Sequence, residues 1–165
     1  MKFSQSVDLA IHALVYIAHN STGEPIMIHE LAQSVRASES YLARVMLWLV
    51  KAGILSSIRG KRGGFIFKIP PQDVTIADIV IAIDREIAEF HCPWENRNCM
   101  ISQDCSVQNL FQEAQKQMLA VLRRMSIGDI AYSQNAECGR AWLKPIPANT
   151  EIIESSDGIT STSIE

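Results

Sequence analysis

Three cysteines carry the most distinctive chemistry in the sequence. Cys92, Cys99 and Cys105 lie in one short stretch, separated by six and five residues. Structural zinc sites favour tighter cysteine pairs, which this stretch lacks. Three soft thiolates on a polar segment suit an iron–sulfur cluster, which takes a fourth ligand from elsewhere. A zinc site, a thiol–disulfide switch and inert loop cysteines are the alternatives that these residues leave open.

The remaining composition is that of a packed soluble protein. Apolar residues make up 47% of the chain and charged residues 20%, both ordinary values. No apolar run is long enough to span a membrane, and Ser, Gln and Asp interrupt the first ten positions, where a signal peptide would have its apolar core. We therefore expect a cytoplasmic protein without a disulfide framework. Cys138, outside the cysteine stretch, is expected to be a free thiol.

Charge is distributed unevenly along the chain. The net charge is −3, yet residues 36–68 hold seven basic residues and one acid, a local charge of +6 that leaves −9 for the rest. A basic segment in an acidic protein is typical of a surface that contacts DNA. A solvated basic face without a partner is the alternative that charge alone leaves open.

The first half of the chain has the element order of a winged helix-turn-helix. Apolar residues recur at helical spacing in three segments, and Ser38 and Gly53 bound the third one. Two β-prone runs follow, separated by a basic, glycine-rich turn, which indicates a hairpin. The predicted elements are helices over residues 4–19, 28–35 and 38–52 and strands over residues 54–58 and 65–69.

The second half must position the cysteines. The predicted elements are a helix over residues 75–87, the irregular cysteine segment 91–105, a long helix over 106–125 and a short helix over 127–132. The long helix has an apolar seam that could pack on its own core or on a second copy. We favour a two-fold dimer, because DNA readers of this size commonly bind pseudo-palindromes.

The expected fold class is therefore mainly α with a small β-hairpin wing. Residues 1–70 are predicted to form a winged helix-turn-helix DNA-binding domain, and residues 71–132 the cluster-binding loop and dimerisation helices. Residues 133–165, rich in Ser, Thr and Glu, are predicted to be a largely disordered tail. In such a fold the third helix enters the major groove and the wing contacts phosphates or the minor groove. The predicted DNA-binding residues are Ser38, Ser40, Tyr41, Arg44, Arg59, Lys61 and Arg62.

A family resemblance covers the chain from Met1 to about Tyr132. The residues that carry it are Met1–Ser4, Asp8–Ala10, Ser40–Leu42, Ala52–Gly53, Ser57–Gly60, Gly63–Gly64, Thr75–Val80 and the three cysteines. In these motifs the chain resembles the Rrf-two family of bacterial winged-helix regulators, in its iron–sulfur cluster branch. The resemblance implies a homodimer whose cysteine loop lies between the DNA-binding domain and the long helix. It also implies DNA contacts by Ser40, Tyr41 and Arg59.

The fourth cluster ligand is less clear from the sequence. One branch of the family has a histidine three residues after the third cysteine, where this chain has Gln108, a poor iron ligand. Other branches resemble this chain in placing an acid on the first helix, matching Asp8, which would reach the cluster of the partner subunit. His12 follows at i+4 on the same helix face. We favour Asp8 over His12, with His91 a weaker candidate; a solvated acid and an ordinary helix histidine are the alternatives.

Together these observations predict a DNA-binding transcriptional regulator, and we expect a repressor. Its affinity for a pseudo-palindromic double-stranded operator would be controlled by an iron–sulfur cluster that senses nitric oxide, redox state or iron supply. A 4Fe–4S cluster is favoured over 2Fe–2S, although the ligand count fits both. The alternative is a cluster-free regulator controlled by thiol oxidation or a protein partner. No phosphate-binding loop or nucleophile–base motif is present, so no enzyme is expected.

Overall fold

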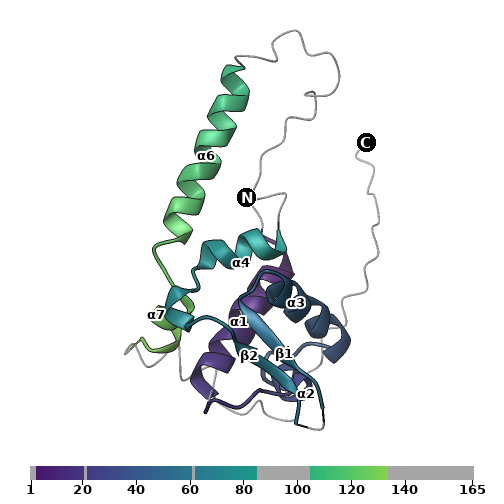
Figure 1. Ribbon diagram of the computed structural model, residues 1–165. Coiled ribbons are helices and arrows are strands. Elements are labelled where there is room, and N and C mark those ends of the chain that lie inside the picture. Colours follow the sequence, from purple (N-terminus) through teal and green to yellow (C-terminus); the bar gives the residue numbers. More distant parts are fainter. Residues whose placement is uncertain (1–2, 21, 61, 85–104, 134–165) are drawn as a thin grey trace, which may run out of the picture.

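The computed structural model describes residues 3–20, 22–60, 62–84 and 105–133. In these ranges it is mainly helical with one antiparallel hairpin, which confirms the predicted fold class (Figure 1). The elements are α1 (Gln5–Asn20), α2 (Ile28–Ser34), α3 (Glu39–Lys51), β1 (Leu55–Ile58), β2 (Gly64–Phe67), the 3-10 turn η1 (Pro71–Asp73), α4 (Ile76–Ile83), α6 (Ser106–Leu122) and α7 (Ile127–Ala131).

Two helix ends differ from the sequence prediction by more than one residue. Helix α4 ends at Ile83, and the rest of the predicted helix, residues 85–87, lies outside the described residues. Helix α6 ends at Leu122 rather than Met125. The Met125 carbonyl instead accepts a hydrogen bond from the Ile76 amide. The last predicted turn of α6 therefore does not form, because its backbone makes a tertiary contact instead. Helical periodicity alone does not predict such a contact.

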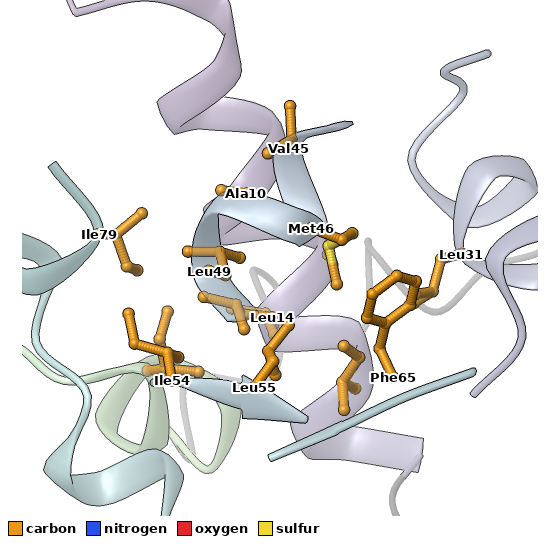
Figure 2. Packing of buried hydrophobic residues seen from close by; sticks show 14 of the residues in the cluster. Ala10, Leu14, Leu31, Val45, Met46, Leu49, Ile54, Leu55, Phe65 and Ile79 are labelled. Carbon is orange, nitrogen blue, oxygen red and sulfur yellow. The ribbon is translucent and has the colours of Figure 1, made fainter. Parts of the chain in front are cut away.

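Helix α3 illustrates how local sequence sets an element. Its cap residue Ser38 is extended and accepts a hydrogen bond from the Tyr41 amide at 3.4 Å. After its last turn Gly53 adopts a φ of +78°, which ends the helix without a Cβ penalty. Four apolar residues between these ends occupy one face and are fully buried; they are Leu42, Val45, Met46 and Leu49. Figure 2 shows Val45, Met46 and Leu49 packed with side chains of α1 and the hairpin.

The wing is a short hairpin attached to the segment before α2. Leu55 pairs with Phe67 and Ile58 with Gly64. Ile26 and Phe65 exchange two backbone hydrogen bonds, of 3.0 and 2.9 Å. This bridge extends the sheet beyond the hairpin, so the wing is fixed on one side to the helix-turn-helix unit.

Gly64 makes that attachment possible, and a side chain there is expected to destabilise the protein. A Cβ on Gly64 would lie 2.2 Å from the Ile26 carbonyl oxygen. We expect Gly64→Ala to lower the free energy of unfolding by about 2–3 kcal/mol, because the backbone would have to separate. Urea unfolding measures this loss. Ser57→Ala, at an exposed position of β1, is the control and should change it by less than about 0.5 kcal/mol; equal stability of both variants would contradict the prediction.

Helices α4 and α7 begin side by side with the same cap. Thr75 and Asp78 form a capping box at the start of α4, and Ser126 and Asp129 form one at the start of α7. The two cap residues pair in an antiparallel bridge, flanked by hydrogen bonds of 3.0 Å (Ile76 amide) and 2.8 Å (Ile127 amide). Hydrogen bonds from Ser126 lower the pKa of Asp129. Its cap is therefore present at neutral pH and is lost only as pH falls through that lowered pKa.

The segment after α6 returns to the core of the first helices. Ile127 and Ala131 of α7 are buried in the same cluster as Leu14 of α1, and the Tyr132 hydroxyl donates a hydrogen bond to the Ala18 carbonyl at 3.2 Å. Helix α6, in contrast, projects away from the other elements and contacts them near α4 (Figure 1). Most of its length therefore lies outside this core.

Candidate DNA-binding surface and cluster ligands

The face of α3 opposite the core is exposed along its whole length. Four residues form it, and we call it the outer face of α3: Ser40, Arg44, Leu47 and Lys51. Ser38, at the cap, is also exposed. Four of the predicted DNA-binding residues belong to α3 or its cap. Three of these, Ser38, Ser40 and Arg44, are exposed and would be accessible to DNA whose major groove receives α3.

Tyr41 is placed differently from these three residues. Its ring is half-buried, and its hydroxyl shares a hydrogen bond of 2.7 Å with Oγ of Ser6, a buried residue on α1. The Arg44 guanidinium lies 5.7 Å from the centre of the Tyr41 ring, a cation–π distance. The Tyr41 hydroxyl thus joins α3 to α1, while Arg44 is held above the ring at the edge of the outer face.

The wing places two of its three predicted basic residues on the surface. Arg59 and Arg62 are exposed on either side of the tip, while Lys61 lies outside the described residues. Gly60, between them, has a φ of +119°, a conformation that favours glycine. The tip therefore presents cations on a backbone that turns sharply.

Two of the predicted cluster ligands, and His12, lie within the described residues. Asp8 and His12 are one turn apart on α1, with 3.9 Å between Asp8 Oδ1 and His12 Nε2. The Asp8 side chain is 77% exposed, whereas that of His12 is 24% exposed. Burial lowers the pKa of His12, and the neighbouring Asp8 carboxylate partly opposes this shift. Asp8 is therefore the more accessible of the two donors.

Cys105 is half-buried at the cap position of α6. Cys92, Cys99 and His91 lie outside the described residues, so their prediction as ligands is not examined by the structure. Within the described ranges, no three His, Cys, Asp or Glu side chains gather in a metal-binding group. Gln108, one turn after Cys105, is half-buried.

Comparison with known proteins places this geometry in a family. The family model Rrf2, described as an iron-dependent transcriptional regulator, matches residues 3–133. The chain belongs to the Rrf2 family. The transcriptional regulator NsrR of Bacillus subtilis is 28% identical over 131 residues, which cover 79% of this chain and 90% of NsrR. The regulator IscR of Escherichia coli O1:K1 is 22% identical over 134 residues, which cover 81% of this chain and 82% of IscR.

Solved structures confirm the fold of this member of the Rrf2 family. CymR, the global cysteine regulator of B. subtilis, matches with a TM-score of 0.62 and 22% identity, over 79% of this chain and 96% of CymR. IscR of T. potens matches with a TM-score of 0.60 and 24% identity, over 78% of this chain and 85% of IscR. The family assignment supports DNA-binding transcriptional regulation, and the relatives are named as regulators rather than enzymes. No helix in the described ranges is both long and apolar enough to cross a membrane.

Sequence reasoning missed the residues that join α1 to its neighbours. Ser6 contacts Tyr41, which lies 35 positions away, and the Ser4 amide donates to Asp84 Oδ2 at 2.8 Å across 80 positions. Both contacts lie within four residues of Asp8. The only signal in the sequence is a pair of hydroxyl residues at the start of a helix, which a cap explains equally well.

Loss of the Ser6 hydroxyl is expected to weaken DNA binding. Ser6→Ala leaves the Tyr41 hydroxyl without this partner and loosens the N-terminal turn of α3. We expect operator affinity to fall about three- to tenfold, the range for one hydrogen bond, in fluorescence anisotropy. Ser34→Ala is the control, because the Ser34 hydroxyl donates within its own turn, to the Leu31 carbonyl. Equal affinities of Ser6→Ala and wild type would rule out this role.

Proposed function

We propose that the protein is a homodimeric repressor of the Rrf2 family whose operator affinity is set by an iron–sulfur cluster, 4Fe–4S in preference to 2Fe–2S. The observation that carries the DNA-binding part is the outer face of α3, which is exposed and carries two cations while the opposite face fills the core. Arg59 and Arg62 extend this basic surface into the wing. Such a surface complements the negative phosphates that flank the major groove.

A second copy of the chain is the proposed cover for α6. Four large apolar residues of this helix are more than half exposed: Val107, Leu110, Phe111 and Val121. Leu110 and Phe111 follow Val107 at steps of three and four, and at 3.6 residues per turn Val121 falls on the same face, as in the seam of a helix pair. Leu119, near the base of the helix, is buried against the body. If the exposed part of α6 pairs with α6 of a second copy, the dimer would place two DNA-binding domains on one pseudo-palindromic operator.

The proposed ligands of the cluster are Cys92, Cys99 and Cys105, with Asp8 of the partner subunit. The two described donors fit this role, since thiolate and carboxylate both bind iron, and the Asp8 carboxylate is exposed to a second copy. When bound, the cluster supplies an iron centre that nitric oxide, oxidants or iron shortage alters. His12 is the second candidate for the fourth position.

Helix α1 provides the proposed connection between ligand and DNA. Asp8 lies two residues after Ser6, and Ser6 bonds to Tyr41 in the first turn of α3. A bond at Asp8 would hold α1, and through Ser6 it would hold the end of the helix that enters the groove. Loss of that bond would let the two DNA-binding domains of the dimer move relative to each other, so that their spacing no longer matches the operator.

Anaerobic purification tests this proposal. We expect brown protein with equal amounts of iron and sulfide, whose affinity for an operator selected from random duplexes falls after treatment with nitric oxide. Colourless protein that stays colourless after reconstitution, yet binds DNA, would overturn the cluster. It would favour instead a regulator controlled by thiol oxidation or a protein partner. Protein that selects no DNA sequence in either state would overturn the DNA-binding part.

A further inference from the structure

One residue of the outer face of α3 has no role in the proposed function. Leu47 is 49% exposed, although the other leucines of α3, Leu42 and Leu49, are completely buried. It therefore contributes little to the core. An isolated exposed leucine is common on protein surfaces and calls for no explanation by itself. Its position among the DNA-facing residues is what distinguishes Leu47.

The helical repeat places Leu47 on the DNA-facing side. Leu47 follows Ser40 by seven residues and Arg44 by three, and Lys51 comes four residues later. At 3.6 residues per turn these four positions fall within an arc of about 60°, opposite the buried face. Leu47 is thus the apolar member of a surface whose other members are a hydroxyl and two cations.

The neighbours of Leu47 leave room for close approach to a base pair. Ser40 and Ala43 precede it on the same ridge, at i−7 and i−4, and both have small side chains. Arg44 is drawn aside over the Tyr41 ring, 5.7 Å from its centre. The small side chains of Ser40 and Ala43 let the helix enter the groove deeply. Leu47 is then the apolar side chain that extends towards the base pairs.

We propose that Leu47 contacts the C5 methyl group of a thymine and makes the protein select a T·A pair at one position of each half-site. The thymine methyl is the apolar group that base pairs expose in the major groove, and apolar side chains recognise it by contact. This inference rests on the proposed function, because it needs the outer face of α3 to lie in the groove. It goes beyond that function by naming a base and the residue that selects it.

Replacing thymine with deoxyuridine removes only the methyl group and tests this contact directly. The full-length protein, purified anaerobically, first selects operators from random duplexes, and each thymine of the selected site is then replaced in turn. At one position per half-site we expect wild type to lose about fourfold in affinity, the amount that burial of one methyl corresponds to. Leu47→Ala should bind the thymine operator about fourfold more weakly and show no further loss with deoxyuridine there.

Two control variants separate this contact from general effects. Leu47→Met keeps an apolar side chain and should retain sensitivity to deoxyuridine. Ile81→Ala removes an exposed apolar side chain from α4 instead, and should show the wild-type pattern. Because Leu47 is exposed, Leu47→Ala should unfold in urea as wild type does.

The outcomes distinguish failure of this inference from failure of the proposed function. If wild type selects a sequence but loses no affinity with deoxyuridine at any position, or if Leu47→Ala loses as much as wild type at every position, the Leu47 contact is wrong and DNA binding stands. If Leu47→Ala changes the mass of the protein in solution instead, Leu47 faces a protein partner and the inference is overturned. If wild type selects no sequence, both the inference and the DNA-binding function fail.

Discussion

Leu110→Glu is expected to convert the protein to a monomer and to lower its affinity for operator by more than about a hundredfold. The Leu110 side chain is 68% exposed near the free end of α6, where we propose that it meets its counterpart on a second copy. A glutamate there would bury two like charges face to face, which opposes association strongly. Each monomer would then bind one half-site, without the gain in effective concentration that a second, linked DNA-binding domain provides.

Analytical ultracentrifugation and anisotropy together measure this effect. The matched control is Lys116→Glu, which places a glutamate at an exposed position on the side of α6 opposite the apolar seam. It should remain a dimer and keep wild-type affinity. A Leu110→Glu protein that sediments as a dimer would show that α6 does not form the dimer interface. A monomeric variant with undiminished affinity would show instead that the two reading heads act independently.

Asp8→Ala is expected to abolish stable cluster binding while leaving the fold intact. The Asp8 side chain is largely exposed, so its removal should change the free energy of unfolding by less than about 0.5 kcal/mol. The proposed cluster would keep three thiolates and lose its fourth ligand. We expect iron and sulfide contents after anaerobic gel filtration to fall at least about fivefold, because one coordination position of the proposed cluster would be left without its carboxylate ligand.

His12→Ala and Cys105→Ser are the informative comparisons for Asp8. Cys105→Ser should lose the cluster as Asp8→Ala does, since both remove a proposed ligand. His12→Ala should keep it, because the His12 side chain is more buried than that of Asp8. A reversed result, with the cluster lost in His12→Ala and kept in Asp8→Ala, would transfer the fourth position to His12. Retention in both variants would place the fourth ligand outside α1.

Local signals predicted much of the fold correctly. Ser38 and Gly53 bound α3 as expected, because a cap and a left-handed terminal residue are properties of neighbouring residues. The hairpin was predicted from a glycine-rich turn between two β-prone runs, and it forms with paired residues Ile58 and Gly64 at its tip. The position of this hairpin after three helices was enough to indicate a winged helix-turn-helix.

Long-range contacts were beyond the reach of the same reasoning. The sequence predicted Thr75 as a cap, and Tyr41 as a DNA contact that stays a prediction, but it did not indicate the bridge from Thr75 to Ser126 or the bond from Tyr41 to Ser6. These pairs depend on how helices pack, which periodicity does not specify. For the candidate site, sequence alone named Asp8 and His12, and the structure added their difference in exposure. The prediction for Cys92 and Cys99 lies outside the described residues.

The bridge between the two cap residues gives α6 the mechanics of a lever. Thr75 and Ser126 fasten the chain just beyond the base of α6, where the cap of α4 and the cap of α7 meet. The 17 residues of α6 span roughly 25 Å at 1.5 Å per residue. A tilt of about 5° at this fulcrum therefore displaces the far end of the helix by about 2 Å. Cys105 lies at that far end, at the cap of α6. A small movement of Cys105 therefore acts through the full length of α6 on the orientation of the helices packed at its base.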